Sequence, residues 1–192
     1  MIVDTHAHFN DPAFDQDRDE LLNKMHEGGI WRIINSGCSV QSTLDSIAMA
    51  EKYRFVYTTA GIHPEYAHET PLSDFDEIAR LARHEKVCAI GEIGLDYHWD
   101  ISYKEKQKEF FVKQILLAKK SGLPFCVHSR DAILDTMTIL KENKNNLDYG
   151  FSVHCFSGSK ETAKEILDLN GYLGFGGTST FKNAKNVLEV ID

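Results

Sequence analysis

Short apolar runs recur along the chain, and each is followed by a longer segment with helical spacing. Most runs are apolar at successive positions, which is typical of strands covered on both faces. We predict strands at Ile2–Thr5, Trp31–Asn35, Phe55–Thr59, Val87–Ile90, Phe125–Val127, Phe151–Val153 and Tyr172–Phe175. The intervening periodicity predicts helices at Asp17–His26, Val40–Lys52, Ser73–Glu85, Tyr103–Lys119, Ala132–Glu142 and Lys160–Leu169.

This alternation of strand and helix predicts a parallel α/β sheet in one domain over residues 1–192. Alternation alone does not distinguish a doubly wound sheet from a (β/α)₈ barrel. A doubly wound sheet usually carries a glycine-rich phosphate loop after its first strand, and this sequence has none there. Polar residues instead follow several different strands, as they do at the active face of a barrel. We therefore predict a (β/α)₈ TIM barrel with about seven β/α units in this chain.

Potential metal ligands follow four of the predicted strands. The first strand leads into His6 and His8, and later strands lead into Glu92, His128 and His154. Residues i and i+2 of an extended strand project to one side, so His6 and His8 can bind one cation. Neutral imidazoles suit Zn, Mn, Fe or Ni, and a carboxylate can bridge two cations. The set predicts a divalent-metal site, although any single histidine would more often be a hydrogen-bonded structural residue.

Composition restricts the function classes further. The 192 residues are 42% hydrophobic and 26% charged, which excludes a disordered tail or a disulfide-stapled miniprotein. Acids outnumber bases 29 to 21, giving a net charge of −8, so a basic surface for nucleic acid is not expected. The N-terminus lacks a signal-peptide pattern, and the four dispersed cysteines indicate buried free thiols in a reducing compartment. We predict a cytoplasmic protein with no membrane partner.

Six motifs, in order, resemble the TatD family of metal-dependent deoxyribonucleases, which are amidohydrolase-type barrels. They are Asp4-Thr5-His6-Ala7-His8, Gly61-Ile62-His63-Pro64, Ile90-Gly91-Glu92-Ile93-Gly94-Leu95-Asp96-Tyr97, Val127-His128-Ser129-Arg130-Asp131-Ala132, Val153-His154-Cys155-Phe156-Ser157-Gly158 and Gly174-Phe175-Gly176-Gly177. The resemblance implies hydrolysis of DNA phosphodiesters, often from the 3′ end, with one or two divalent cations (Mg, Mn or Zn).

The resemblance also implies roles for individual residues. His6 and His8 resemble the ligands of one cation, His128 and His154 those of a second, and Glu92 the carboxylate that bridges them. Glu92 and His128 are therefore the expected catalytic residues. His63 and Arg130 resemble residues that line the substrate side.

One feature departs from the family pattern. The family's last strand normally ends in a Thr-Asp pair whose aspartate completes the site, whereas this sequence ends at Leu188-Glu189-Val190-Ile191-Asp192. Barrels of this kind typically need about 250 residues. We expect that the last strand–helix unit and its aspartate are missing.

The leading hypothesis is therefore a deoxyribonuclease acting at 3′ ends or on single strands through metal-activated water. One alternative is a metal-dependent ester or amide hydrolase, such as an aminoacyl-ester hydrolase, because the same ligand set serves other substrates. Another is a truncated chain that binds metal or phosphate without turnover. The sequence leaves metal identity, strand preference and oligomeric state open.

Overall fold

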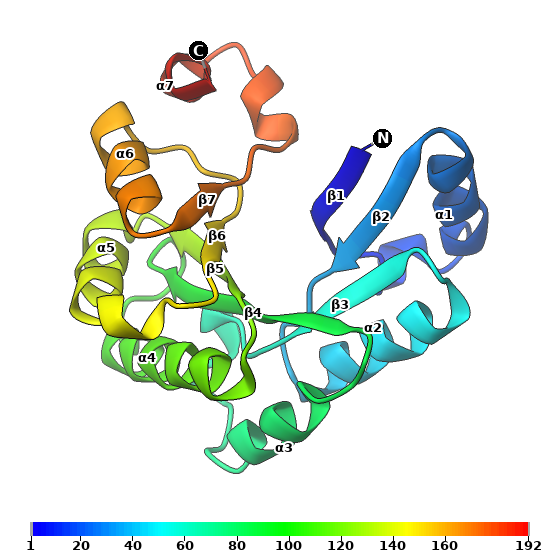
Figure 1. Ribbon diagram of the computed structural model, residues 1–192, viewed down its shortest axis with the longest axis horizontal. Coiled ribbons are helices and arrows are strands. Elements are labelled where there is room, and N and C mark those ends of the chain that lie inside the picture. Colours follow the sequence, from blue (N-terminus) through cyan, green and yellow to red (C-terminus); the bar gives the residue numbers. More distant parts are fainter. Residues whose placement is uncertain (1, 192) are drawn as a thin grey trace.

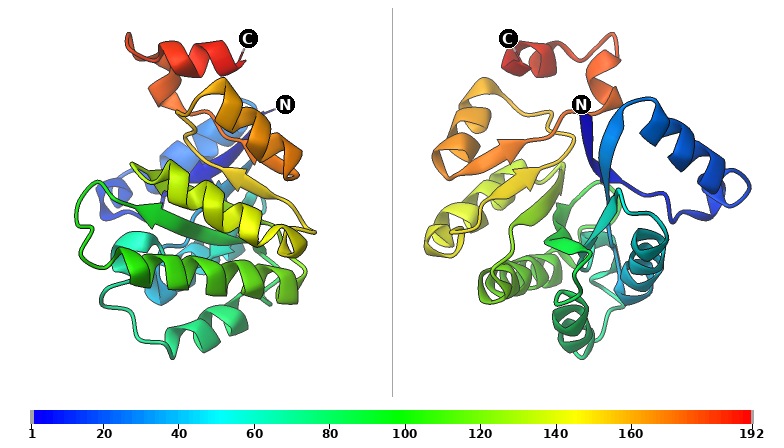
Figure 2. Two further views of the ribbon diagram at one scale, coloured as in Figure 1. Left: turned by 90° about the vertical axis from the view of Figure 1, so that its left-hand side faces the viewer. Right: turned by 45° about the vertical axis from the view of Figure 1, so that its right-hand side comes forward.

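Seven parallel strands form one curled sheet in the computed structural model, which describes residues 2–191. The strands pair in chain order, and Figures 1 and 2 show the sheet bent into a half-barrel with helices outside it. This architecture confirms the predicted barrel-type fold. The strands are β1 (Ile2–Ala7), β2 (Ile30–Asn35), β3 (Val56–Ala60), β4 (Val87–Asp96), β5 (Phe125–Arg130), β6 (Phe151–Val153) and β7 (Gly171–Leu173).

A helix follows each strand, and the first six lie outside the sheet, whereas the last contacts the sixth (Figure 2). These helices are α1 (Arg18–Glu27), α2 (Val40–Lys52), α3 (Asp74–Leu81), α4 (Lys104–Ser121), α5 (Ile133–Glu142), α6 (Lys160–Asp168) and α7 (Lys185–Ile191). Ser159 caps α6, since its hydroxyl accepts a hydrogen bond from the Thr162 amide at 3.3 Å. Gly122 ends α4 at φ 70°, a left-handed conformation that favours glycine.

The largest difference from the predicted elements lies in β4, which continues six residues beyond Ile90 to Asp96. The register with β5 shifts between Ile90 and Ile93, and pairing then resumes until Asp96 lies opposite Arg130. The strand therefore carries polar side chains in its second half, where the sequence suggested a loop. Helix α3 is shorter than predicted, because the chain turns after Leu81 to enter β4.

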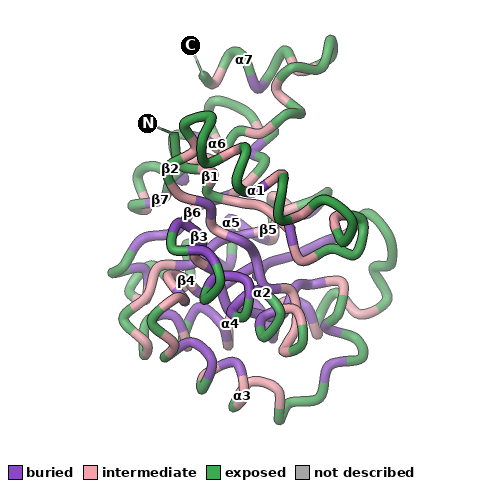
Figure 3. The backbone as a smooth tube through the Cα atoms, turned by 90° about the vertical axis from the view of Figure 1, so that its right-hand side faces the viewer, coloured by how far each residue is buried: buried purple, intermediate pink, exposed green. Residues whose placement is uncertain are grey.

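The core lies between the sheet and its helices, where the tube in Figure 3 is mostly buried. The larger cluster includes Ile93, Phe110 and Phe111, and packs β3 to β6 against α3 to α6. A second cluster around Leu22 and Ile33 packs α1 and α2 against β2 and β3. Together these clusters fix the strands whose carboxyl ends carry the polar motifs.

The four cysteines are all free thiols, as predicted, but they are not all buried. Cys126 is buried and Cys38 and Cys88 are partly buried, whereas Cys155 is exposed. The prediction was wrong for Cys155 because the backbone turns there at φ 44°, just after β6. Within residues 2–191, no helix is long and apolar enough to cross a membrane. Asp192, discussed above for the last strand, lies outside the described residues.

Candidate metal centre

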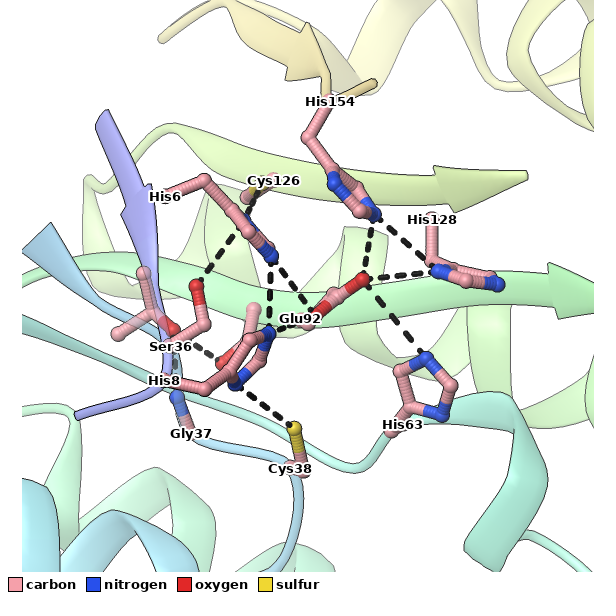
Figure 4. Close-up of polar contacts among 12 residues, drawn as sticks. His6, His8, Ser36, Gly37, Cys38, His63, Glu92, Cys126, His128 and His154 are labelled. Atoms are coloured by element: carbon pink, nitrogen blue, oxygen red, sulfur yellow. Dashed lines mark hydrogen bonds and ion pairs between the residues drawn. The ribbon is translucent and has the colours of Figure 1, made fainter. Parts of the chain in front are cut away.

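The five predicted ligands meet at the carboxyl-end side of the sheet. His6 lies in β1 with His8 directly after it, Glu92 lies in β4, His128 in β5, and His154 directly after β6. Figure 4 shows their side chains converging on the Glu92 carboxylate. Residues separated by up to 148 positions are brought together because parallel strands end at the same edge of the sheet.

The Glu92 carboxylate contacts histidines with both of its oxygens. Oε2 lies 3.2 Å from His6 Nε2 and 3.3 Å from His8 Nε2. Oε1 lies 2.9 Å from His128 Nδ1 and 2.5 Å from His154 Nε2. The ring nitrogens also face one another, with 3.0 Å between His6 and His8 Nε2 atoms and 3.1 Å between His128 Nδ1 and His154 Nε2. Nitrogen and oxygen lone pairs are thus concentrated in one small volume.

Glu92 is ionised in this setting although its side chain is only 3% exposed. Burial alone would raise the pKa of Glu92, but hydrogen bonds from His128, His154, His6 and His8 outweigh burial and hold the pKa well below its usual value. Burial lowers the pKa of His6, so its ring favours the neutral form that binds metals. The centre therefore combines one fixed negative charge with several imidazoles.

Asp96 belongs to the site and was given no role from the sequence. Its Oδ2 lies 2.8 Å from His128 Nε2, and its Oδ1 accepts a hydrogen bond from the His98 amide at 2.9 Å. Burial lowers the pKa of His128, but the Asp96 and Glu92 carboxylates outweigh burial and raise it. Asp96 holds the Nε2 proton and orients the ring with Nδ1 toward Glu92, where Nδ1 would have to give up its own proton to bind a cation. The i, i+4 spacing of Glu92 and Asp96 places both on one face only because β4 continues past Ile90, which the local pattern did not predict.

Gly94 allows β4 to approach β5 closely beside these ligands. Its φ is 136°, and a Cβ atom at this position would lie 2.0 Å from the backbone oxygen of His128. Any other residue would have to move the strand that carries His128. Gly94 therefore allows the close spacing of β4 and β5.

A cavity of about 240 Å³ opens beside Glu92 and His128. The two residues expected on the substrate side, His63 and Arg130, both line it. His63 is buried, with Nε2 3.7 Å from Glu92 Oε1, and burial lowers its pKa to about 4. Arg130 is exposed at the mouth, where its guanidinium lies 5.3 Å from the ring centroid of Trp99. Trp99 is 67% exposed and was also missed in the sequence.

Smaller polar groups support the histidines from neighbouring strands and loops (Figure 4). The Ser36 hydroxyl lies 3.1 Å from His6 Nδ1, and the Cys38 thiol lies 3.8 Å from His8 Nδ1. Such contacts hold the outer nitrogen of each ring and orient the inner nitrogen. Neither residue stands in a motif that marked it from the sequence.

The donor set fits divalent cations. Three groups of residues each bring their ligand atoms within 4.8 Å of one another. Glu92 belongs to all three, with His6 and His154, with His8 and Cys38, and with His63 and His128. Imidazole nitrogen and carboxylate oxygen are ligands that Zn²⁺ and Mn²⁺ accept. The groups overlap at Glu92 and place His6 beside His154. The two Glu92 oxygens, in contrast, contact His6 with His8 and His128 with His154.

The chain is similar to a known family and to several of its members. The family described as TatD related DNase matches residues 3–192. The uncharacterized metal-dependent hydrolase YabD of Bacillus subtilis is 45% identical over 191 residues, covering 100% of this chain and 74% of that protein. The 3′-5′ ssDNA/RNA exonuclease TatD of Cronobacter sakazakii is 32% identical over 164 residues, covering 85% of this chain and 62% of that protein. The crystal structure of the TatD homologue YjjV from Escherichia coli superposes with a TM-score of 0.91 at 32% identity, covering 99% of this chain and 73% of that one.

Proposed function

Because the chain belongs to the TatD family of metal-dependent hydrolases, we propose that it hydrolyses DNA phosphodiester bonds, working from the 3′ ends of single strands. The observation that carries the proposal is the Glu92 carboxylate, buried among histidines and opening into a cavity whose mouth holds Arg130. A phosphate that entered this cavity would reach the guanidinium and the histidine cluster together.

We assign the cation-binding role to His6, His8, Glu92, His128 and His154. When bound, Mg²⁺, Mn²⁺ or Zn²⁺ would polarise the phosphate as a Lewis acid and lower the pKa of a nearby water. Glu92 would contribute both oxygens to the centre and neutralise part of the charge of a bound cation. We therefore assign the catalytic role to Glu92 and His128, as the family resemblance implies.

The chain's own residues position the substrate and hold protons. Asp96 keeps the Nε2 proton of His128 at 2.8 Å, so this ring presents Nδ1 to the centre throughout turnover. His63 stays neutral at physiological pH because burial lowers its pKa to about 4. A neutral His63 can accept or donate a hydrogen bond to substrate without adding charge.

A nucleic acid is favoured over a small ester by the pair at the cavity mouth. The Arg130 guanidinium can bind a phosphate in two-pronged geometry, while the exposed Trp99 ring offers a face for a base. The net charge of −8 does not oppose this, because bound cations and Arg130 would attract the phosphate locally. The exonuclease name of the Cronobacter relative points in the same direction.

The test compares oligonucleotides labelled at the 3′ or the 5′ end with a panel of aminoacyl and other carboxyl esters. Protein stripped by EDTA should be inactive, and Mg²⁺ or Mn²⁺ should restore stepwise release from the 3′ end. Glu92→Gln should abolish release, whereas Glu109→Gln, at an exposed carboxylate paired with Lys113, should not. Turnover of esters without oligonucleotide cleavage would favour the ester-hydrolase alternative, and cleavage insensitive to EDTA would overturn the metal mechanism.

A further inference from the structure

A second cavity lies at the opposite end of the sheet from the metal centre. It measures about 520 Å³, against about 240 Å³ for the cavity beside Glu92. We call it the basal pocket; it is lined by His26, Trp31, Arg32, Arg54, Phe55, Tyr57 and Lys86. These residues come from the end of α1 and from the amino-terminal ends of β2, β3 and β4 (Figure 1).

Positive charge is concentrated in the basal pocket without a matching carboxylate. Within residues 2–191, Arg32, Arg54 and Lys86 form no ion pair, and the pocket lining contains no acidic side chain. The Lys86 ammonium instead lies 3.4 Å from the Tyr53 and Val56 carbonyl oxygens, and Arg32 donates to the Trp31 carbonyl at 2.9 Å. Carbonyl groups hold these cations in place but carry no net charge that would cancel them. In a chain of net charge −8, this pocket is therefore a local concentration of positive charge that favours anions.

Aromatic rings alternate with these cations. The Arg32 guanidinium lies 4.1 Å from the Trp31 ring centroid and 5.9 Å from that of Tyr57, and the Lys86 ammonium lies 5.1 Å from the Tyr57 ring. Trp31 is 46% exposed, so a large part of its ring is accessible to a ligand. On the other side of the pocket, the His26 ring stacks on Phe55 with 4.0 Å between centroids.

This combination fits a ligand with both a flat ring and a phosphate. Aromatic side chains bind bases by stacking, and arginine and lysine bind phosphate oxygens. Arg32 already lies against the Trp31 ring, but a simple anion would still leave the exposed part of Trp31 without a ligand, whereas an apolar ligand would leave three cations without an anionic partner. The volume lies within the range of pockets that hold small organic ligands, roughly 300 to 1,000 Å³.

We propose that the basal pocket binds a nucleoside phosphate, either as a free nucleotide or as one unit of a single strand. The site is separate from the metal centre and does not require hydrolysis there. The phosphate lies against Arg32, Arg54 and Lys86, and the base lies against Trp31. If the ligand is part of a strand, the protein holds nucleic acid at both ends of the barrel.

The test uses Trp99→Phe protein, in which Trp31 is the remaining tryptophan, so that quenching reports the basal pocket. EDTA is present to prevent turnover. The protein is titrated separately with inorganic phosphate, with dAMP and with a short single-stranded oligonucleotide. Saturable quenching by dAMP identifies a free nucleotide as ligand, and quenching by the oligonucleotide alone identifies a strand. No quenching by either, or equal affinity for inorganic phosphate, overturns the proposal.

Charge variants tie the binding to this pocket. Arg54→Gln and Lys86→Gln should each weaken binding about tenfold, since each removes a charge-assisted phosphate contact. Arg83→Gln is the matched control, because Arg83 is exposed nearby but does not line the pocket. Arg54→Gln alters an exposed side chain and keeps the Lys86 contacts to carbonyl groups, so it remains informative if Lys86→Gln misfolds. Glu92→Gln should leave this binding unchanged, so a failed nuclease assay would not affect the result. Equal binding by wild type and Arg54→Gln protein contradicts the assignment.

Discussion

Replacing Asp96 by asparagine should weaken divalent-cation binding by about 10- to 100-fold, although Asp96 is not expected to touch the cation. Asp96 is 3% exposed and accepts the Nε2 proton of His128 at 2.8 Å. In the variant, the side-chain oxygen can still accept from the His98 amide at its present position, which turns the new amide NH₂ toward His128. Two donors would then face each other. His128 would relieve this by moving its proton to Nδ1, the nitrogen directed at Glu92.

The expected loss of Mn²⁺ affinity can be measured by thermal unfolding with and without Mn²⁺. At a metal concentration of about 100 times the wild-type Kd, binding stabilises the fold by about 2.7 kcal/mol. A variant that binds 100-fold more weakly gains only about 0.4 kcal/mol under the same conditions. Calorimetric titration with Mn²⁺ gives the two dissociation constants directly.

Asp135→Asn is the matched control for this experiment. Like Asp96, Asp135 accepts a side-chain hydrogen bond at 2.8 Å, in this case from the Tyr97 hydroxyl. Its Oδ2 also lies 2.8 Å from the Lys108 ammonium. It does not contact the histidine cluster, so its amide variant should keep the wild-type metal affinity. If Asp96→Asn also binds Mn²⁺ within twofold of wild type, the positioning role assigned to Asp96 is wrong.

Three further predictions concern the same centre. Gly94→Ala should lower both the Tm in thermal unfolding and the Mn²⁺ affinity in titration, because the new Cβ would clash with the His128 carbonyl oxygen. Gly177→Ala is the control and should change neither, because nothing lies within 4 Å of the new Cβ. Burial lowers the pKa of His154, but neighbouring Cys155 and Glu92 outweigh it and raise the pKa to about 9. Calorimetry should therefore show Mn²⁺ binding weaken as pH falls below 9, with proton release on binding, and a pH-independent affinity between 6 and 9 would refute this. Trp99→Ala should raise KM for a single-stranded oligonucleotide about 5- to 100-fold in steady-state assays, but not for the same strand with an abasic 3′-terminal residue.

The order of elements and the ligand positions were predictable because each depends on local pattern. An apolar run followed by His128 or His154 identifies both a buried strand and the group at its end. Parallel pairing then brings those ends together without further information from the sequence. This is why the five proposed ligands meet in the structure.

The missed features depend on contacts between distant segments. β4 continues to Asp96 because it pairs with β5 after a register shift, so Asp96 was not placed beside His128 from local pattern. Trp99 acquires its position only where the chain after β4 meets Arg130. The basal pocket likewise joins Arg32, Tyr57 and Lys86 from three separate strand starts. None of these neighbours has a fixed spacing in the chain that would identify it.

The most direct test of the proposed metal centre at Glu92 is anomalous X-ray diffraction from crystals of the protein saturated with Mn²⁺. We predict anomalous density beside the Glu92 carboxylate, in contact with ring nitrogens of at least two of His6, His8, His128 and His154. Absence of density at Glu92 under saturating Mn²⁺, or density bound only elsewhere on the molecule, would contradict it.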